Sequence, residues 1–240
     1  MRQGVQYALN ALQMAAEKGH KGAQLFVMRF SEHLRDDLEG ISRQFVECFS
    51  PSGDDLGQWR AYADNGKGFA LGFDGPRLEA AFGKMPHLCG TFAMNYDELA
   101  LRAAAERIAA EALQAAEFPV GKGYDGPTLS AFLHALSVQI SNAILYTAMF
   151  FKHSAYAIER EYRFQHVRAI DNVEGIVTIG DRRYIEFDWR SSDPGLLTNI
   201  VIGPTADREQ ATRYAEECLR SAGLDPHKVR IQNSAIPYRG

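Results

Sequence analysis

The chain has 240 residues, of which 46% are hydrophobic and 23% are charged, and its formal net charge at pH 7 is −4. This composition is ordinary for a globular protein and excludes a disordered chain. The weakly acidic balance, with no run of Lys and Arg, also excludes a bulk nucleic-acid-binding surface.

The three cysteines, Cys48, Cys89 and Cys218, lie far apart and show no C-x-x-C spacing. We therefore expect reduced, mostly buried thiols in a cytoplasmic protein. The histidines also lack the spacing of metal ligands, so no metal site is predicted.

The chain opens inside a helical pattern, because Val5, Leu9, Leu12 and Ala16 recur three or four residues apart with no N-cap before them. We predict a helix from about residue 2 and expect that an upstream segment is missing. A break at 19–22 separates this helix from a second one, which should end near Glu39.

The next part of the chain alternates short strands and short helices. Apolar runs and Pro, Gly, Asn and Asp turns predict a strand at 45–50, a helix at 56–62, a strand at 69–73, a helix at 76–82 and a strand within 87–96.

Two long helices are predicted next, at 98–118 and 127–152. The stretch 132–151 has about the length of a membrane span, but Ser137, Gln139 and Asn142 interrupt it. We therefore predict a largely buried core helix and no association with a membrane.

The last third is rich in strands, predicted at 161–167, 176–179, 184–187, 197–202 and 229–231, with a helix at 206–222. Strands and helices do not alternate regularly. This favours an α+β fold with a mixed, mostly antiparallel sheet flanked by several helices, in a single domain over 1–240.

The first candidate site segment contains Ser50, Trp59, Arg60 and Tyr62. On a helix, Trp59 and Tyr62 share a face, and Arg60 points about 100° away from Trp59. An arginine beside two rings suits an anionic group on a flat heterocycle. The alternative is that the rings belong to the core and Arg60 makes an ion pair.

The second segment contains Lys152, His153, Glu159, Glu161 and Arg163. A strand would place Glu159, Glu161 and Arg163 on one face. Two carboxylates and a guanidinium so close together are costly to bury unless they are paired. The alternative is a solvated sheet face with cross-strand ion pairs.

The third segment combines 202–204 (Ile-Gly-Pro) with 236–239 (Ile-Pro-Tyr-Arg), which includes Tyr238 and Arg239. Gly203-Pro204 leads from a strand into a helix N-terminus, where an anion could bind. The alternatives are a plain turn and a frayed C-terminal tail.

These segments together resemble a bacterial domain-of-unknown-function family (number twenty-nine seventy-one). The resemblance rests on Trp-Arg-x-Tyr-Ala at 59–63, on Phe-Lys-His-x-x-Tyr-x-x-Glu-x-Glu-Tyr-Arg at 151–163 and on the two motifs of the third segment, and it covers 45–239. Members usually begin with a strand bearing His or Tyr and an Asn-Asp-x-x-Glu element. The chain lacks both, so the resemblance implies a truncated or inactive form if that element completes the site.

The layout is also similar to that of ADP-ribosyltransferases, an analogy that assigns roles to the same residues. Glu161 would bind the ribose hydroxyl, Arg60 the pyrophosphate, and Trp59 or Tyr62 the nicotinamide, while Glu159 would orient the acceptor. The other polar residues would help to bind substrate: Ser50, Lys152, His153, Arg163, Tyr238 and Arg239.

Two functions follow. The first is a transferase or glycohydrolase that uses NAD or a related small-molecule nucleotide. The second is a non-catalytic binding or regulatory module in bacterial stress or phage defence, in which the charged residues form an internal ion-pair network. The sequence identifies no protein partner.

Overall fold

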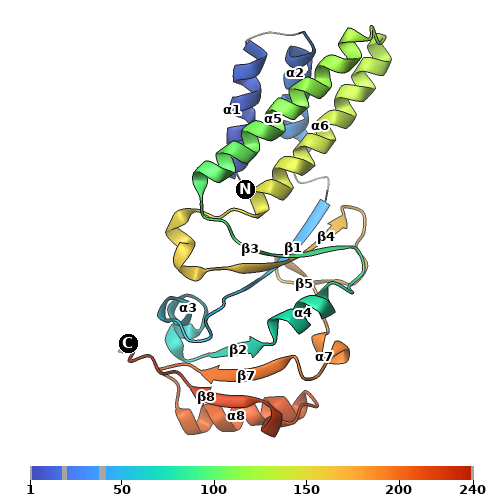
Figure 1. Ribbon diagram of the computed structural model, residues 1–240. Coiled ribbons are helices and arrows are strands. Elements are labelled where there is room, and N and C mark those ends of the chain that lie inside the picture. The colour runs from blue at the N-terminus through green and yellow to red at the C-terminus, as the bar shows by residue number, and fades with distance from the viewer. Residues whose placement is uncertain (1, 18–20, 38–41, 239–240) are drawn as a thin grey trace. The chain divides into compact units, whose positions relative to one another are not determined.

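The computed structural model describes residues 2–17, 21–37 and 42–238. The chain forms two compact units (Figure 1). Unit 1 consists of residues 1–43 and 93–158, and unit 2 of residues 44–92 and 159–240. Each unit has its own hydrophobic core. That the two units fold together as one domain stays a prediction.

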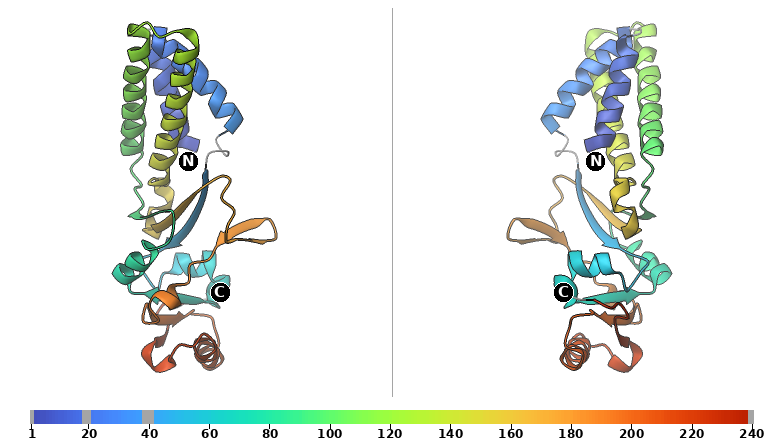
Figure 2. Two further views of the ribbon diagram at one scale, coloured as in Figure 1. Left: turned by 90° about the vertical axis from the view of Figure 1, so that its right-hand side faces the viewer. Right: turned by 90° about the vertical axis from the view of Figure 1, so that its left-hand side faces the viewer.

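Unit 1 is a helical bundle of α1 (Arg2–Glu17), α2 (Lys21–Asp37), α5 (Glu98–Gly121) and α6 (Gly126–Met149), which run side by side in Figure 2. Phe26 and Phe30 of α2 are fully buried against the alanines of α5. The small side chains allow close approach: a Cβ on Gly22 would lie 2.6 Å from the carbonyl oxygen of Ala116. The helical spacing of apolar residues therefore explains how the helices of this unit pack together.

The helix α6 is less buried than the sequence suggested. Its buried residues form a single stripe that includes Leu133, Leu136 and Ile144, whereas most of its first two turns are exposed. The prediction of a largely buried helix was wrong, because a helix in so small a bundle is covered on one side only. Within the described residues, α6 is the one helix with the length and apolar composition of a membrane span, a test that bundle helices can also pass.

The strands of unit 2 form small sheets instead of a single large one. Among the described residues, one sheet has the order β1 (Ser42–Phe49), β4 (Tyr162–Ala169), β3 (Leu88–Ala93), and a second has the order β2 (Phe69–Phe73), β7 (Leu197–Ile202), β8 (Arg230–Asn233). β5 (Ile176–Ile179) and β6 (Arg182–Ile185) form a hairpin. β2 runs antiparallel to β7, whereas β8 runs parallel to β7. The α+β prediction is confirmed.

The helices of unit 2 begin at aspartate caps. α3 (Leu56–Tyr62), α4 (Gly75–Phe82), α7 (Trp189–Ser192) and α8 (Arg208–Ser221) each start after an Asp that accepts a hydrogen bond from the backbone N–H three residues later. α8 packs Ala215 and Leu219 against Leu197 and Ile200 of β7. One face of the β2-β7-β8 sheet is thus partly covered.

Two further expectations need correction. The strand predicted at 184–187 is β6, which ends at Ile185, because Phe187 leaves the hairpin and packs edge-on against Phe82 with ring centroids 5.5 Å apart. The free cysteines are not mostly buried: Cys218 is exposed, Cys89 is half-buried, and Cys48 is exposed as a residue although its thiol is partly buried beside Glu161.

The remaining short helices are of the 3-10 type. They are η1 (Asp64–Gly66), η2 (Ser154–Glu159) and η3 (Pro226–Lys228).

Candidate functional site

Trp59, a predicted stacking platform, is a core residue. Its side chain is only 2% exposed, and its indole N–H donates a 2.7 Å hydrogen bond to Oδ1 of Asp54. Nearby, the hydroxyl oxygen of Ser50 accepts a 3.3 Å hydrogen bond from the N–H of Ser52 and shapes the turn before α3. The core alternative for this ring therefore describes the structure.

Asp54 joins α3 to the C-terminal segment. Oδ1 also accepts a 2.6 Å hydrogen bond from the hydroxyl of Ser234, and Oδ2 a 2.8 Å bond from the N–H of Ala235. Burial alone would raise the pKa of Asp54, but the bonds from Ser234, Trp59 and Ala235 outweigh it and lower the pKa below its ordinary value. The carboxylate thus acts as a structural link.

Arg60 and Tyr238, two of the residues predicted for the site, lie close together. The Arg60 guanidinium carbon lies 5.5 Å from the centroid of the Tyr238 ring, and the Tyr238 hydroxyl donates a 2.7 Å hydrogen bond to Oδ1 of Asn65. Tyr62 is 71% exposed on the same helix. Arg239 lies outside the described residues. The first and third segments converge, and the tail is held by specific contacts as far as Tyr238.

The Ile-Gly-Pro motif has a structural explanation. A Cβ on Gly203 would lie 2.2 Å from the carbonyl oxygen of Gly66, so no larger residue fits where β7 passes η1. The N–H of Gly203 donates to the carbonyl of Gly68 at 2.9 Å, and the N–H of Thr205 to that of Gly66 at 3.0 Å. The motif builds a turn.

Glu161 is enclosed in a charged cluster of unit 2. It is 4% exposed, accepts a hydrogen bond from Nε of Arg163 at 2.5 Å and another from the thiol of Cys48 at 2.8 Å. Burial of the thiol, followed by its bond to Glu161 and the charge of that carboxylate, raises the pKa of Cys48 to about 11. Glu159, by contrast, is half-buried at the end of η2.

Lys152 and His153 belong to unit 1. The ammonium nitrogen of Lys152 lies 4.7 Å from the centroid of the Tyr156 ring. Nδ1 of His153 accepts a 3.1 Å hydrogen bond from the N–H of Ala155 and so holds the first turn of η2. Both side chains thus have local structural contacts.

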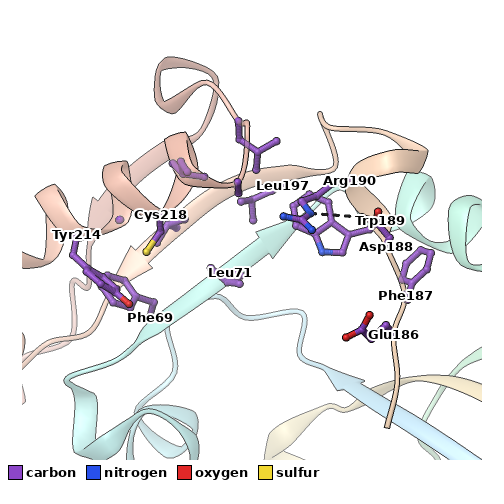
Figure 3. Close-up of a pocket in the computed structure, with 15 residues that line it drawn as sticks. Phe69, Leu71, Glu186, Phe187, Asp188, Trp189, Arg190, Leu197, Tyr214 and Cys218 are labelled. Atoms are coloured by element: carbon purple, nitrogen blue, oxygen red, sulfur yellow. Dashed lines mark ion pairs between the residues drawn. The ribbon is translucent and has the colours of Figure 1, made fainter. Parts of the chain in front are cut away.

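One hollow of unit 2 is a cleft of about 810 Å³ between β2, α8 and the segment 186–190 (Figure 3). Phe69 and Tyr214 stack at one end with their centroids 6.0 Å apart, and Trp189 and Arg190 lie at the other, with Leu71 and Leu197 between them. The lining is mostly apolar: Phe69, Leu71, Phe187, Trp189, Leu197, Ile200, Tyr214, Ala215, Leu219, Ala222 and Leu224.

The polar groups of the cleft lie mainly on one wall. Nε of Arg190 is 3.5 Å from Oδ1 of Asp188, and Glu186 is exposed two residues earlier. Hydrogen bonds from the side chain and backbone of Ser191 lower the pKa of Asp188, so this carboxylate is ionised at neutral pH. Across the cleft, a hydrogen bond with Cys218 raises the pKa of Tyr214. The wall carries a net negative charge.

Of the residues predicted for the site, those that the structure describes do not line this cleft. Sequence reasoning missed it because its walls come from three distant segments without a shared motif. The one local signal is Phe-Asp-Trp-Arg at 187–190, where two rings alternate with two charges. Among the described residues, no group of three or more His, Cys, Asp or Glu side chains is arranged to hold a metal ion.

Of the comparisons with known proteins, only the one with protein families gives a match. No curated protein and no solved structure matches the chain. Residues 58–164 match the family described as protein of unknown function (DUF2971), a range that includes Trp59 and Glu161 but not Ser50 or the two C-terminal motifs. Over these residues, less than half of the chain, the sequence is similar to that family.

Proposed function

We propose that this chain is a non-catalytic binding module whose cleft in unit 2 holds the apolar body of a neutral or cationic organic molecule. The observation that carries the proposal is the cleft itself: about 810 Å³, with walls of aromatic and aliphatic side chains. Small-molecule sites typically have volumes of about 300–1,000 Å³ and mostly apolar linings. A bacterial, cytoplasmic setting in stress or phage defence belongs to the same proposal.

The charges of the cleft favour one class of ligand. Asp188 and Arg190 compensate each other, which leaves Glu186 as the excess charge on that wall. A carboxylate beside aromatic rings attracts a cation and repels an anion. The ligand is therefore neutral or positively charged near Glu186.

The surroundings of the predicted catalytic residues give the NAD-using transferase less support. The carboxylate of Glu161 already accepts hydrogen bonds from Arg163 and Cys48, and the indole N–H of Trp59 already donates one to Asp54. The transferase stays a prediction, and calorimetric titration of NAD into the native chain tests it. We expect no heat of binding; a saturable signal that Glu161→Gln abolishes would favour the transferase.

Two fluorescent probes test the cleft. N-phenyl-1-naphthylamine is neutral, and its 8-sulfonate carries the same rings with a negative charge. We expect the neutral probe to bind with increased fluorescence and the sulfonate to bind at least about fivefold more weakly, the effect of roughly 1 kcal/mol of repulsion. Glu186→Gln should strengthen sulfonate binding and leave the neutral probe unchanged.

A matched pair of variants at one position locates the probe. Cys218 is exposed on α8 and lines the cleft, so Cys218→Trp fills the space without entering the core. This variant should lose most binding of the neutral probe, whereas Cys218→Ala should retain it. Equal binding by both variants would show that the probe lies elsewhere and would refute the proposal.

A further inference from the structure

Arg168 carries a positive charge that is buried without a counter-charge. It lies on β4, the central strand of the β1-β4-β3 sheet, and is 8% exposed. Its Nε donates a 3.2 Å hydrogen bond to Nε2 of His166, and its Nη1 donates one to the backbone carbonyl of Glu174. Neither acceptor is negatively charged, and no carboxylate of a described residue lies within 4.0 Å of the guanidinium nitrogens. Because removal from water is costly for a charge, a buried guanidinium normally has an anionic partner.

His166, the neighbour of Arg168, holds a hydrogen-bond donor that has no acceptor. The residue is 1% exposed, and burial, followed by the charges of Arg168 and His87, lowers the pKa of His166, so the ring is uncharged at neutral pH. Because Nε2 accepts the bond from Arg168, the proton of the uncharged ring is on Nδ1. Nδ1 is buried and has no hydrogen-bond partner among the described residues. Buried donors are rarely left unpaired, because the loss of their bonds to water is then not repaid.

Two neighbours extend this pair toward the surface. His87, which directly precedes β3, is exposed, and its ring centroid lies 5.6 Å from that of His166. The side-chain nitrogen of Asn172 lies 3.4 Å from Nε2 of His87. All four residues belong to unit 2, and we call them the His-Arg cluster: His87, His166, Arg168 and Asn172. The cluster therefore combines a buried positive charge and a buried donor with polar side chains nearer the surface.

We infer that the His-Arg cluster binds a phosphate monoester group, whose oxygens accept hydrogen bonds from Nδ1 of His166 and from the guanidinium of Arg168. Of the five N–H groups of an arginine, the bonds to His166 and Glu174 use two, so donors remain. A planar guanidinium matches the oxygens of a phosphate, and the anion supplies the missing counter-charge. Only the end of a ligand can reach a residue that is 8% exposed, which favours a terminal phosphate over a bridging diester.

Two-dimensional NMR of the histidine rings tests where phosphate binds. At about pH 8, where phosphate carries about two negative charges, inorganic phosphate is titrated into the native chain. The ring signals of His87 and His166 should shift saturably, with a Kd of about 1 mM or lower, as expected for a few charge-assisted hydrogen bonds. His227, an exposed histidine of the same unit, should not shift. Sodium chloride at equal ionic strength controls for screening and should leave all three signals unchanged.

Two organic phosphates test the class of ligand. Methyl phosphate is a monoester and keeps three unesterified oxygens, whereas dimethyl phosphate is a diester with one negative charge and two such oxygens. We expect methyl phosphate to bind about as tightly as inorganic phosphate, and dimethyl phosphate to bind at least about tenfold more weakly because it loses a charge-assisted hydrogen bond. Equal affinity for the two compounds would overturn the assignment to a monoester.

A pair of arginine variants tests the buried charge. Arg168→Met removes the guanidinium but keeps an apolar side chain, and it should weaken phosphate binding at least about tenfold. The matched control is Arg183→Met, at an exposed arginine of β6, which should bind phosphate as the native chain does. His87→Asn supplies a variant outside the core, because Asn adopts the left-handed φ of 77° at this position. This variant should weaken phosphate binding about threefold or more, the effect of one lost hydrogen bond.

The inference does not rest on the proposed function, because none of the four cluster residues lines the cleft. Signals of His87 and His166 that ignore phosphate, or that respond equally to chloride, would overturn the phosphate site. Native affinity in Arg168→Met would overturn it as well, and if that variant does not fold, native affinity in His87→Asn has the same meaning. None of these results would alter binding of the neutral probe, and loss of probe binding would leave the phosphate titration intact.

Discussion

Glu161 lies between the guanidinium of Arg163 and the thiol of Cys48, with 4% of its surface exposed. Replacing it by glutamine removes a buried negative charge beside a guanidinium that is only 20% exposed. We expect Glu161→Gln to lower the free energy of unfolding by about 3 kcal/mol, the lower end for a broken buried pair. Denaturant titration measures this, and Glu159→Gln, at a half-buried carboxylate, should change stability by much less.

The thiol of Cys48 gives a local readout of the same change. With a pKa of about 11, it is almost fully protonated at pH 8 and should react slowly with iodoacetamide. Removing the neighbouring carboxylate lowers that pKa, so Glu161→Gln should increase the alkylation rate of Cys48 severalfold. An unchanged rate at Cys89 would show that the fold stays closed, and an unchanged rate at Cys48 would contradict the electrostatic account.

At the level of single residues, the sequence could not decide between site and core. Trp, Arg and Glu serve both purposes, and their roles here depend on partners far along the chain. Asp54 is five residues from Trp59 but 180 from Ser234. No local sequence pattern indicates the contact between Asp54 and Ser234.

Most secondary-structure elements could be predicted because their signals are local. Aspartates mark the starts of α3, α4, α5, α6 and α8, and helical or alternating spacing fixes the type of each element. What the spacing could not give was the burial of α6. That depends on how many neighbours the bundle supplies.

The attachment of the C-terminal segment to α3 depends on one carboxylate. In Asp54→Asn, an amide NH2 replaces one carboxylate oxygen and faces a hydrogen-bond donor. The segment 234–238 should therefore detach from α3, and the free energy of unfolding should fall by about 2 kcal/mol. Hydrogen exchange would show faster exchange at Ala235 and Ile236. Asp55→Ala removes the α3 cap instead and should leave exchange in the tail unchanged.

The same contact predicts how stability changes with pH. Because the pKa of Asp54 in the folded chain is below its ordinary value of 3.8, the stabilisation is complete above that value and is lost as the pH falls through the folded pKa. Asp54→Asn should remove this part of the acid sensitivity. Identical acid-denaturation curves for the native chain and the variant would argue against the link.

At the scale of the whole molecule, the cleft depends on topology. The cleft combines β2 with the segment 186–190, more than a hundred residues later, and with α8, about twenty residues after that. The β2-β7 pairing, the packing of Trp189 against Phe73 and the packing of α8 bring these segments together. Apolar positions in strands and helices predict a core. They do not show where an uncovered part of a sheet face becomes a hollow.

Thermal unfolding can test whether unit 1 and unit 2 unfold independently of each other. Both tryptophans, Trp59 and Trp189, lie in unit 2, so their fluorescence reports that unit, while far-UV circular dichroism is dominated by the helices of unit 1. Phe30→Ala empties a fully buried position of the bundle and should cost about 3–5 kcal/mol. Because each unit has its own core, we expect the dichroism transition to move to lower temperature while the fluorescence transition stays in place.

The reciprocal variant completes the test. Leu196 is fully buried in a core of unit 2, so Leu196→Ala should shift the fluorescence transition and spare the dichroism transition. If either variant shifts both transitions together, the two cores unfold cooperatively, as the single domain predicted from the sequence requires. The cleft would then depend on the packing of the bundle, and Phe30→Ala would release the neutral probe at the same temperature at which the helices melt.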